Sequence, residues 1–226
     1  MLTAIRDVLL PLTLPRGDSV ALYDRLAPRY DRMHRRWLER AGAESLAALQ
    51  GCLAAELEPG RRVLDAGCGP GTLARWVMGA EPGADLTLVD LAPAMLERAS
   101  SVPGRHVHAD LLALPFSEAE FDIVICAWAL ETTAEPERAV AELVRVLAPG
   151  GLLCLCFCTQ PVAVGERLRS LPLRLSVRHG FGGLFLQGNF PQWLPHRQPR
   201  RLVSRRQLAS FACWRKPPGS PAGVEP

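Results

Sequence analysis

Aspartates and glycines are the residues of this chain whose types and spacing point most directly to chemistry. Segment 65–71 reads DAGCGPG, with an acid followed by three alternating glycines. Glycines let the backbone turn sharply and approach a ligand closely, and free amides at a helix start attract an electronegative group. By itself such a loop is a weak signal, because many nucleotide-binding turns share it.

Two further aspartates make the signal more specific. Asp90 follows Gly71 by 19 residues, close to the ~20-residue spacing at which an acid ending the next strand accepts ribose hydroxyls. Asp110 follows a third apolar run. Acids at the carboxyl ends of successive parallel strands meet at one edge of the sheet, where ligands bind in such folds. The sequence therefore predicts a ligand site at that edge.

The elements that must position these residues follow from the apolar pattern. Between residues 61 and 158, short apolar runs alternate with helical patterns, which is typical of βαβ units. The runs are nearly continuous, as expected where helices cover both faces of a parallel sheet. The predicted elements are strands Arg61–Ala66, Asp85–Asp90, Arg105–Ala109, Phe121–Ala127, 152–158 and Leu208–Trp214, helices within 18–56, and a helix Pro136–Leu147 that ends at 149–151 before the fifth strand. After residue 159, frequent Pro, Gly and Arg predict no long element.

Five ordered segments resemble the class I S-adenosylmethionine-dependent methyltransferases, and among them the ubiquinone/menaquinone-biosynthesis-like (methyltransferase type 11) group. They are YDRLAPRYD (23–31), VLDAGCGPGTLA (63–74), LVDLAPAML (88–96), HADLLALPFSEAEFDIV (108–124) and AELVRVLAPGG (141–151). The resemblance covers residues 20–158. It implies an α/β, Rossmann-like doubly wound, mostly parallel sheet with helices on both faces, and S-adenosyl-L-methionine as the cofactor.

The resemblance also implies which residues bind that cofactor. They are Asp65 with Gly67, Gly69 and Gly71 for the aminoacyl end, Asp90 for the ribose hydroxyls, Leu91 and Met95 for the faces of the adenine, Asp110 with the Leu111 amide for its amino edge, Tyr23 and Tyr30 over the cofactor, and Ala127 beside the methionine.

No catalytic base is assigned from the sequence. A sulfonium methyl is already activated, so the protein mainly aligns the nucleophile and excludes water, and a base helps only oxygen or nitrogen acceptors. His34, on a predicted helix, has a position that could face the site, but a lone histidine is more often at the surface or in the core. His106 and His108 share one strand face, where a neutral packed pair is favoured over a metal site.

The seven cysteines include no CxxC pair, which predicts free thiols in a reducing, cytoplasmic compartment. Cys154, Cys156 and Cys158 alternate along one strand and share a face. We expect apolar packing there rather than arsenic-type thiol chemistry, because cysteine is among the most buried residue types. Arg6 and Asp7 interrupt the first apolar stretch, so no secretory signal is expected.

Charge divides the chain into two parts. Residues 1–159 carry 15 Arg against 21 acids, and residues 160–226 carry 10 Arg and one Lys against two acids, within a total of +3. Such asymmetry indicates either an anionic partner or a solvated arginine-rich surface. Residues 2–14 and the Arg cluster 197–206 could rest on an anionic bilayer. Nucleic acid is disfavoured, because only Phe190 and Trp193 interleave with the arginines.

A single methyltransferase domain is expected at 18–216. The domain consists of a helical prelude at 18–60, a cofactor-binding core at 61–158, and a basic substrate-side segment with the last strand at 159–216. An apolar N-terminal segment at 1–17 and a disordered tail at 217–226 are expected to flank it. The oligomeric state is not indicated.

The expected function is methyl transfer to a small or lipid-like acceptor, of quinone type or another small molecule. Three alternatives stay open: a membrane-surface phospholipid N-methyltransferase, an amino-transferring relative of the rhodoquinone type, and a non-catalytic cofactor-binding partner protein. The acceptor is not assigned, because segment 128–133 (WALETT) departs from the His-rich turn of relatives and segment 160–207 is distinctive.

Overall fold

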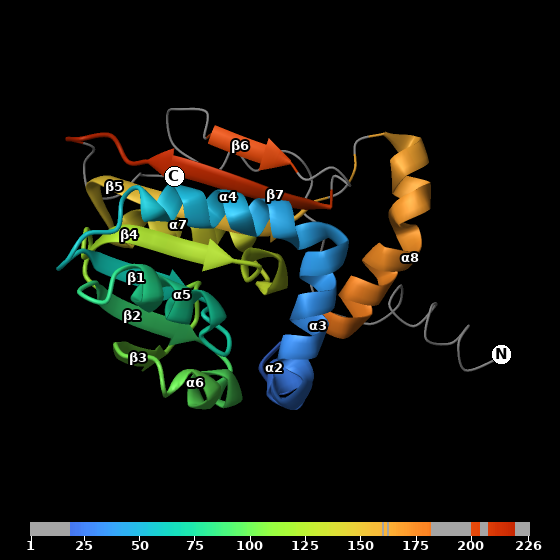
Figure 1. Ribbon diagram of the computed structural model, residues 1–226, viewed down its shortest axis with the longest axis horizontal. Helices are drawn as coiled ribbons and strands as arrows, with labels where there is room; N and C mark the ends of the chain where they lie inside the picture. The colour runs from blue at the N-terminus through green and yellow to red at the C-terminus, as the bar shows by residue number, and fades with distance from the viewer. Residues whose placement is uncertain (1–18, 160, 162, 182–199, 204–207, 220–226) are drawn as a thin grey trace.

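The computed structural model of the chain describes residues 19–159, 161, 163–181, 200–203 and 208–219 (Figure 1). The apolar segment 1–17, the aromatic residues near 190 and most of the predicted tail lie outside the described residues. The side chains of the Arg cluster 197–206 lie outside them as well.

A seven-stranded sheet with the order β3-β2-β1-β4-β5-β7-β6 forms the centre of the molecule. The strands are β1 (Arg62–Ala66), β2 (Asp85–Asp90), β3 (Arg105–His108), β4 (Phe121–Ala127), β5 (Leu147–Cys158), β6 (Arg200–Val203) and β7 (Ala209–Arg215). Strands β1 to β5 pair in parallel, while β7 is antiparallel to both β5 and β6. The predicted mostly parallel, doubly wound sheet is confirmed. Its order reverses between β1 and β4, the switch point where such sheets bind ligands.

Helices cover both faces of this sheet, as the apolar strands predicted. They are α2 (Ser19–Leu26), α3 (Tyr30–Trp37), α4 (Ala43–Ala54), α5 (Thr72–Ala80), α6 (Pro93–Ala99), α7 (Pro136–Val146) and α8 (Val164–Phe181), with short turns of helix at Ala27–Arg29, Leu38–Gly42 and Leu130–Thr132. One core cluster joins α4 and α5 to Val63 and its neighbours. The other joins α7 to Leu64 and the opposite face. Successive residues of β1 are therefore buried on opposite sides.

The fifth strand begins earlier than residue 152, the start that the glycines at 149–151 predicted. It starts at Leu147, which pairs with Phe121, and its register then shifts before Leu152. The amide of Gly150 donates to the Lys216 carbonyl at 2.9 Å, and the Lys216 amide donates to Gly151 at 2.9 Å. These non-local pairs draw the turn into the sheet. The predicted helix stop before the fifth strand is confirmed, since α7 ends at Val146, but the strand starts five residues earlier than predicted.

The expectation of no long element after residue 159 was also wrong, because α8 has 18 residues and contains Pro172. A proline inside a helix removes a hydrogen bond and disfavours the helix locally. Packing compensates here: Val177 is buried and Leu173 half-buried in a cluster with Trp37. Strand β6 is a second element that the sequence pattern did not indicate.

Helices α2 and α3 stand at the carboxyl ends of the parallel strands, where the arrows of β1, β2 and β4 point (Figure 1). The Arg98 guanidinium on α6 lies 2.6 Å from the Asp31 carboxylate on α3 and also donates to the Ala27 carbonyl. The Asp24 carboxylate on α2 accepts the Ala94 amide at 3.1 Å. These contacts hold the helical prelude over one end of the sheet.

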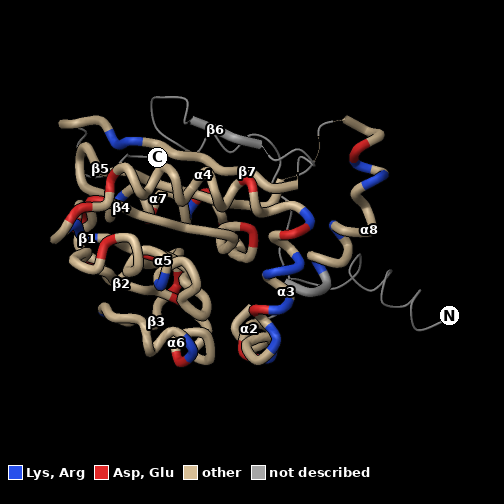
Figure 2. Tube along the Cα trace, viewed as in Figure 1, with Lys and Arg blue, Asp and Glu red and all other residues tan. Residues whose placement is uncertain are grey.

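Figure 2 shows arginine segments along α3 and α8. In the part of the chain that the structure describes, none of the helices combines the length and apolar content needed to cross a membrane.

Candidate active site

The glycine turn between β1 and α5 has the backbone that the sequence indicated. Gly67, Gly69 and Gly71 have φ values of +75°, +54° and +77°, in the region that side chains disfavour. A Cβ added to Gly67 would stand 2.4 Å from the Cβ of Ala129. Glycine at this position is therefore required both by the backbone angle and by the close approach of the loop after β4.

Asp65, the last residue but one of β1, has one carboxylate oxygen without a hydrogen bond among the described residues. Its side chain is 2% exposed, and its Oδ2 has no hydrogen-bond partner among the described residues. Burial raises the pKa of this carboxyl to about 7; the nearby Asp90 charge adds to the rise, and a hydrogen bond from the Ala74 amide opposes it. A buried carboxylate with a free oxygen is suited to an ammonium group, such as the α-amino group of an amino acid.

Asp90 ends β2 and is fixed through both oxygens. Oδ2 accepts the Gly69 amide at 2.7 Å, and Oδ1 accepts the Ala92 amide at 2.9 Å. Burial raises the pKa of Asp90, while those backbone hydrogen bonds oppose the rise. Each carboxylate oxygen has a second lone pair, so the group retains the capacity to accept a diol.

A cavity of about 840 Å³, which we call the cofactor cavity, lies over these strand ends. Nine of the predicted residues line it. They are Tyr23, Tyr30, Gly67, Gly69, Asp90, Leu91, Asp110, Leu111 and Ala127. The Asp110 carboxylate accepts the Leu112 amide at 2.9 Å. Residues from α2 to β4 therefore meet at one edge, as the spacing of the three acids predicted. That they bind a cofactor stays a prediction.

The other three predicted residues lie elsewhere. Asp65 lines an adjoining cavity of about 490 Å³, which shares Gly67 and Ala127 with the first. Gly71 caps the start of α5. Met95 is fully buried in a cluster with Ala27 and lines none of the three cavities described here. Its contact with the adenine stays a prediction.

A third cavity of about 360 Å³, which we call the aromatic pocket, adjoins the cofactor cavity. Its lining residues are Tyr23, Tyr30, His34, Trp37, Trp128, Glu131, Thr132, Cys158 and Val177. The rings of Tyr30 and His34 stack with centroids 5.5 Å apart, and His34 meets Trp128 edge-on at 5.3 Å. Most of the pocket wall is aromatic, and the rings contact one another, so little free space remains between them.

Glu131 is the acidic side chain of the aromatic pocket. It is 4% exposed; its Oε1 accepts the Cys158 amide at 3.0 Å, and its Oε2 has no partner among the described residues. Burial raises the pKa of Glu131 to about 7, and the amide and thiol of Cys158 oppose part of that rise. Such a group is an acceptor of hydrogen bonds and, near neutral pH, of protons.

His34 also reaches the aromatic pocket, in contrast to the expectation of a surface or core residue. Among the described residues, its buried Nε2 has no partner. Burial lowers the pKa of His34, with the Asp31 charge opposing that effect. Burial therefore favours the neutral form of the ring.

Trp128 and Glu131 are site residues that the sequence reasoning did not assign. Trp128 has φ +56°, an unusual value for a bulky residue that is associated with functional sites. The available signal was an acid near the carboxyl end of the fourth apolar strand, because Asp65, Asp90 and Asp110 also lie near the carboxyl ends of their strands.

His106 is half-buried and His108 is exposed, so the expected packed pair is not observed. The Nε2 atoms of His106 and His108 each lie 2.9 Å from a backbone carbonyl, of Val102 and Leu91 respectively. Cys154, Cys156 and Cys158 are buried in β5, which confirms the packing prediction. None of the seven cysteines, all of which lie in the described part of the chain, forms a disulfide bond.

Comparisons with known proteins agree with this geometry. Residues 64–155 match the family described as "Methyltransferase domain". Demethylmenaquinone methyltransferase of Thermus thermophilus is 38% identical over 146 residues, 58% of this chain and 62% of that protein. The protein of the same name from Deinococcus radiodurans is 33% identical over 220 residues, 87% of this chain and 86% of that protein. Malonyl-[acyl-carrier protein] O-methyltransferases also match.

The alignment with the Thermus protein thus spans less than two thirds of that relative. Among solved structures, magnesium protoporphyrin IX methyltransferase of Synechocystis PCC 6803, with bound SAH, has a TM-score of 0.65 at 19% identity, covering 88% of this chain and 100% of that one. This likeness confirms the fold. The chain has the glycine turn and the strand-end acids, and one relative matches it over most of both chains. It therefore belongs to the class I S-adenosylmethionine-dependent methyltransferase family, in its ubiquinone/menaquinone-like group.

Proposed function

We propose that this chain transfers a methyl group from S-adenosylmethionine to a small, planar, apolar acceptor of quinone type. The observation that carries the proposal is the buried, unpartnered Oδ2 of Asp65, next to the glycine turn and close enough to Asp90 for the two charges to interact. The aromatic pocket beside this site adds apolar, aromatic walls next to the cofactor cavity. The demethylmenaquinone methyltransferases among the relatives support the same class.

The residues present fit the cofactor. Asp65 would pair with its α-amino group, the Gly67–Gly71 backbone would approach its carboxylate end, and Asp90 would accept the ribose hydroxyls. When bound, S-adenosylmethionine supplies an activated methyl group on a sulfonium sulfur. The protein's part is to align the acceptor with that methyl group and exclude water. Tyr23 and Tyr30, which line both the cofactor cavity and the aromatic pocket, would close the site between them.

Calorimetric titration with S-adenosylhomocysteine tests the cofactor site. We expect saturable binding, weakened roughly tenfold or more in Asp65→Asn and in Asp90→Asn, because each change removes a charge from a hydrogen-bonded contact. Asp85→Asn is the matched control, since Asp85 is exposed at the opposite end of β2. Absence of binding, or equal affinity in all four proteins, would contradict the proposal.

Turnover separates an enzyme from a cofactor-binding partner protein. Cofactor labelled in its methyl group is incubated with the protein and a membrane-containing cell extract. Label recovered in an apolar product supports the proposal, and label in phospholipid headgroups would instead support the N-methyltransferase alternative. The intact Asp65 and full glycine turn favour methyl transfer over the amino-transferring alternative.

We also propose that the protein is cytoplasmic and meets an anionic membrane surface through α8. Val164, Leu168 and Leu171 are 71%, 67% and 41% exposed, and their spacing places them along one side of the helix. The same helix carries Arg167, Arg169, Arg174 and Arg178 against the single acid Glu166. Exposed apolar residues flanked by arginines suit the interface of an anionic bilayer, where apolar quinone-type acceptors partition.

A further inference from the structure

We propose that the sulfur atoms of Cys52, Cys154 and Cys213 together bind one thiophilic divalent metal ion of the kind of Zn²⁺ or Cd²⁺. We call these three residues the thiol cluster. The proposal goes beyond methyl transfer and does not rest on it, because none of the three residues lines any of the three cavities described above. The sequence pattern did not indicate the cluster, since it associated Cys154 with the other cysteines of its own strand.

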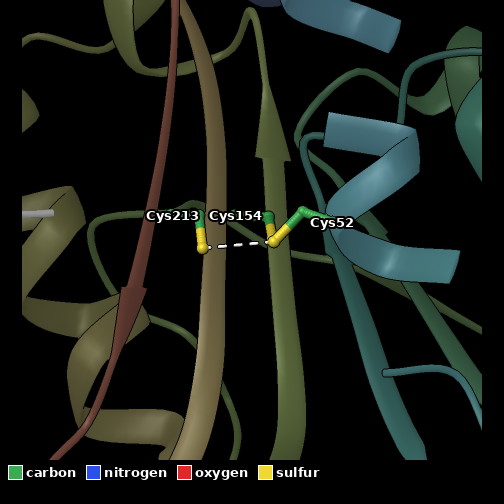
Figure 3. Close-up of side chains that lie close together, drawn as sticks. All are labelled: Cys52, Cys154 and Cys213. Atoms are coloured by element: carbon green, nitrogen blue, oxygen red, sulfur yellow. Dashed lines mark hydrogen bonds between the residues drawn. The ribbon is translucent and has the colours of Figure 1, made fainter. Parts of the chain in front are cut away.

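Three elements bring the sulfur atoms together. Cys154 on β5 is directly opposite Cys213 on the antiparallel strand β7, and the side chains of such a pair share a face with Cβ atoms about 4.5–5.5 Å apart. Helix α4 packs against both strands and supplies Cys52. Figure 3 shows the three side chains converging on one face of the sheet. Tertiary packing therefore joins residues that are up to 161 positions apart.

The distances between the sulfur atoms suit a single ion. All three Sγ atoms lie within 4.8 Å of one another, and those of Cys52 and Cys213 are 3.1 Å apart. Sulfurs at ~2.3 Å from one tetrahedral ion stand about 4 Å apart. The Cys52 and Cys213 sulfurs therefore need to separate by about 1 Å or less, which small rotations about the side-chain torsions provide.

The ligand set determines which ions fit. Within the described part of the chain, the cluster contains sulfur ligands and neither a carboxylate nor an imidazole. Thiolates favour soft or borderline ions such as Zn²⁺, whereas Mg²⁺ and Ca²⁺ prefer oxygen. Cys52 and Cys213 are only half-buried, so an ion can enter from their side. A water molecule on that side would complete a four-coordinate shell.

The present bonding of the three thiols is weak. The Cys52 thiol donates to the Cys213 sulfur, and Cys154 has hydrogen bonds with both. Thiols are weak donors and weak acceptors. The hydrogen bonds with Cys213 and Cys52, together with burial, raise the pKa of Cys154, which favours the protonated thiol in the absence of an ion. An incoming ion would replace these hydrogen bonds with metal–sulfur bonds.

The binding step balances in atoms and charge. Three thiols and one divalent ion give one complex of three thiolates with a net charge of −1, and three protons leave to the solvent. No electron is transferred and no disulfide bond forms. The bound ion would hold α4 against β5 and β7. Because it would bind the folded arrangement of all three ligands, it should raise the thermal stability of the chain.

Titration with Cd²⁺ tests the cluster directly. The untagged protein is reduced with a phosphine, because a thiol reductant would compete for the ion, and sulfur-to-cadmium charge-transfer absorption is followed. We expect saturation at one equivalent per chain, with three protons released for each ion. Zn²⁺ should displace Cd²⁺, and an excess of Mg²⁺ should not.

Serine variants assign the ligands. Cys52→Ser and Cys213→Ser should each weaken Cd²⁺ binding by roughly a hundredfold or more, because even residues that only support metal ligands contribute roughly 10–100-fold. Cys156→Ser is the matched control. Cys156 lies on β5, the strand of Cys154, and is buried against the same face, but it is outside the cluster. Its thiol donates to the Ser45 carbonyl on α4 at 3.4 Å, a hydrogen bond that serine can retain.

Thermal unfolding supplies a second readout. Saturating Cd²⁺ should raise Tm in the wild type and in Cys156→Ser, and leave it unchanged in Cys52→Ser and Cys213→Ser. Unchanged far-ultraviolet circular dichroism and S-adenosylhomocysteine affinity verify that a variant is folded. Because Cys52 and Cys213 lie on different elements, either variant gives the test if the other does not fold.

Two results would overturn the proposal. One is the absence of saturable absorption in the wild type, which is the result expected if the thiols serve only for packing. The other is an unchanged Cd²⁺ affinity in a folded Cys52→Ser or Cys213→Ser variant. Failure of the proposed methyl-transfer function is distinguishable, since it would appear as loss of S-adenosylhomocysteine binding while the Cd²⁺ titration stays the same.

Discussion

Three buried carboxyl groups have raised pKa values, and two of them, Asp65 and Glu131, define a pH window for the ligand-free protein. Burial raises the pKa of both Asp65 and Glu131 to about 7, whereas in the unfolded chain both titrate near pH 4. An acid with a raised folded-state pKa binds its proton more tightly when folded, so stability is present below the unfolded value and is lost as pH rises through the folded value. The window of this loss is about pH 4 to 7.

We therefore expect the ligand-free protein to be more stable at pH 5 than at pH 8, by on the order of 3 kcal/mol for each group. Thermal unfolding at both pH values measures the difference, and Asp65→Asn or Glu131→Gln should each reduce it. Asp122 and Glu142 have lowered pKa values. The stability that these two groups contribute is therefore lost only at pH values below this window. A difference that is unchanged in both variants would contradict the expectation.

Gly67 is the position where a single methyl group should disable the site. A Cβ there meets Ala129 at 2.4 Å and the backbone has φ +75°. Gly67→Ala should destabilise the protein by on the order of 2–4 kcal/mol and weaken S-adenosylhomocysteine binding. Gly79→Ala is the control: that helical glycine is exposed with nothing within 4 Å of an added Cβ, and the change should stabilise by roughly 0.5–1 kcal/mol. Equal effects of the two changes on unfolding would argue against the clash.

At the scale of elements, one arginine connects the helical prelude to the sheet layer. Arg98 on α6 pairs with Asp31 on α3 at 2.6 Å and donates to the Ala27 carbonyl. The pair is partly exposed, so its contribution to global stability is small. Its structural consequence is larger, because α2 and α3 carry Tyr23, Tyr30 and His34 to the cavities.

Arg98→Met should therefore weaken S-adenosylhomocysteine binding by roughly threefold to thirtyfold, with a change in Tm of only about 2 °C or less. Calorimetry and thermal unfolding give the two numbers. Arg138→Met is the matched control, because Arg138 lies on the exposed side of α7 and pairs only locally with Glu135 among the described residues. An affinity loss shared by both variants would contradict a specific role for Arg98.

For the whole molecule, charge and exposed apolar surface coincide on α8, at one side of the sheet (Figures 1 and 2). If α8 meets lipid, a negative charge in its apolar stripe should prevent docking. Leu168→Glu should abolish co-flotation with vesicles containing phosphatidylserine, and high salt should weaken flotation of the wild type. Ala141→Glu, at an exposed position of α7, introduces the same charge elsewhere and should leave flotation unchanged. Equal flotation of both variants would exclude α8 as the contact.

The sequence by itself determined the local and periodic features of this protein. Apolar runs bounded by Gly, Pro and Asp located five parallel strands to within a few residues, because burial on both faces leaves little freedom in composition. The spacing of Asp65, Asp90 and Asp110 placed three acids at one sheet edge, since parallel strands all end there. The glycine turn was also identified, because its backbone needs φ values that other residues avoid.

Only the tertiary structure decided the features that depend on contacts between distant segments. Helix α8 forms despite Pro172 because it packs near Trp37, more than a hundred residues earlier. Glu131 becomes a buried acceptor because α2, α3 and β5 enclose it, and Cys52, Cys154 and Cys213 meet because α4 lies across β5 and β7. Periodicity reports which face of an element is buried. It does not report which other element covers that face, and that covering sets the pKa of Glu131 and brings the three thiols together.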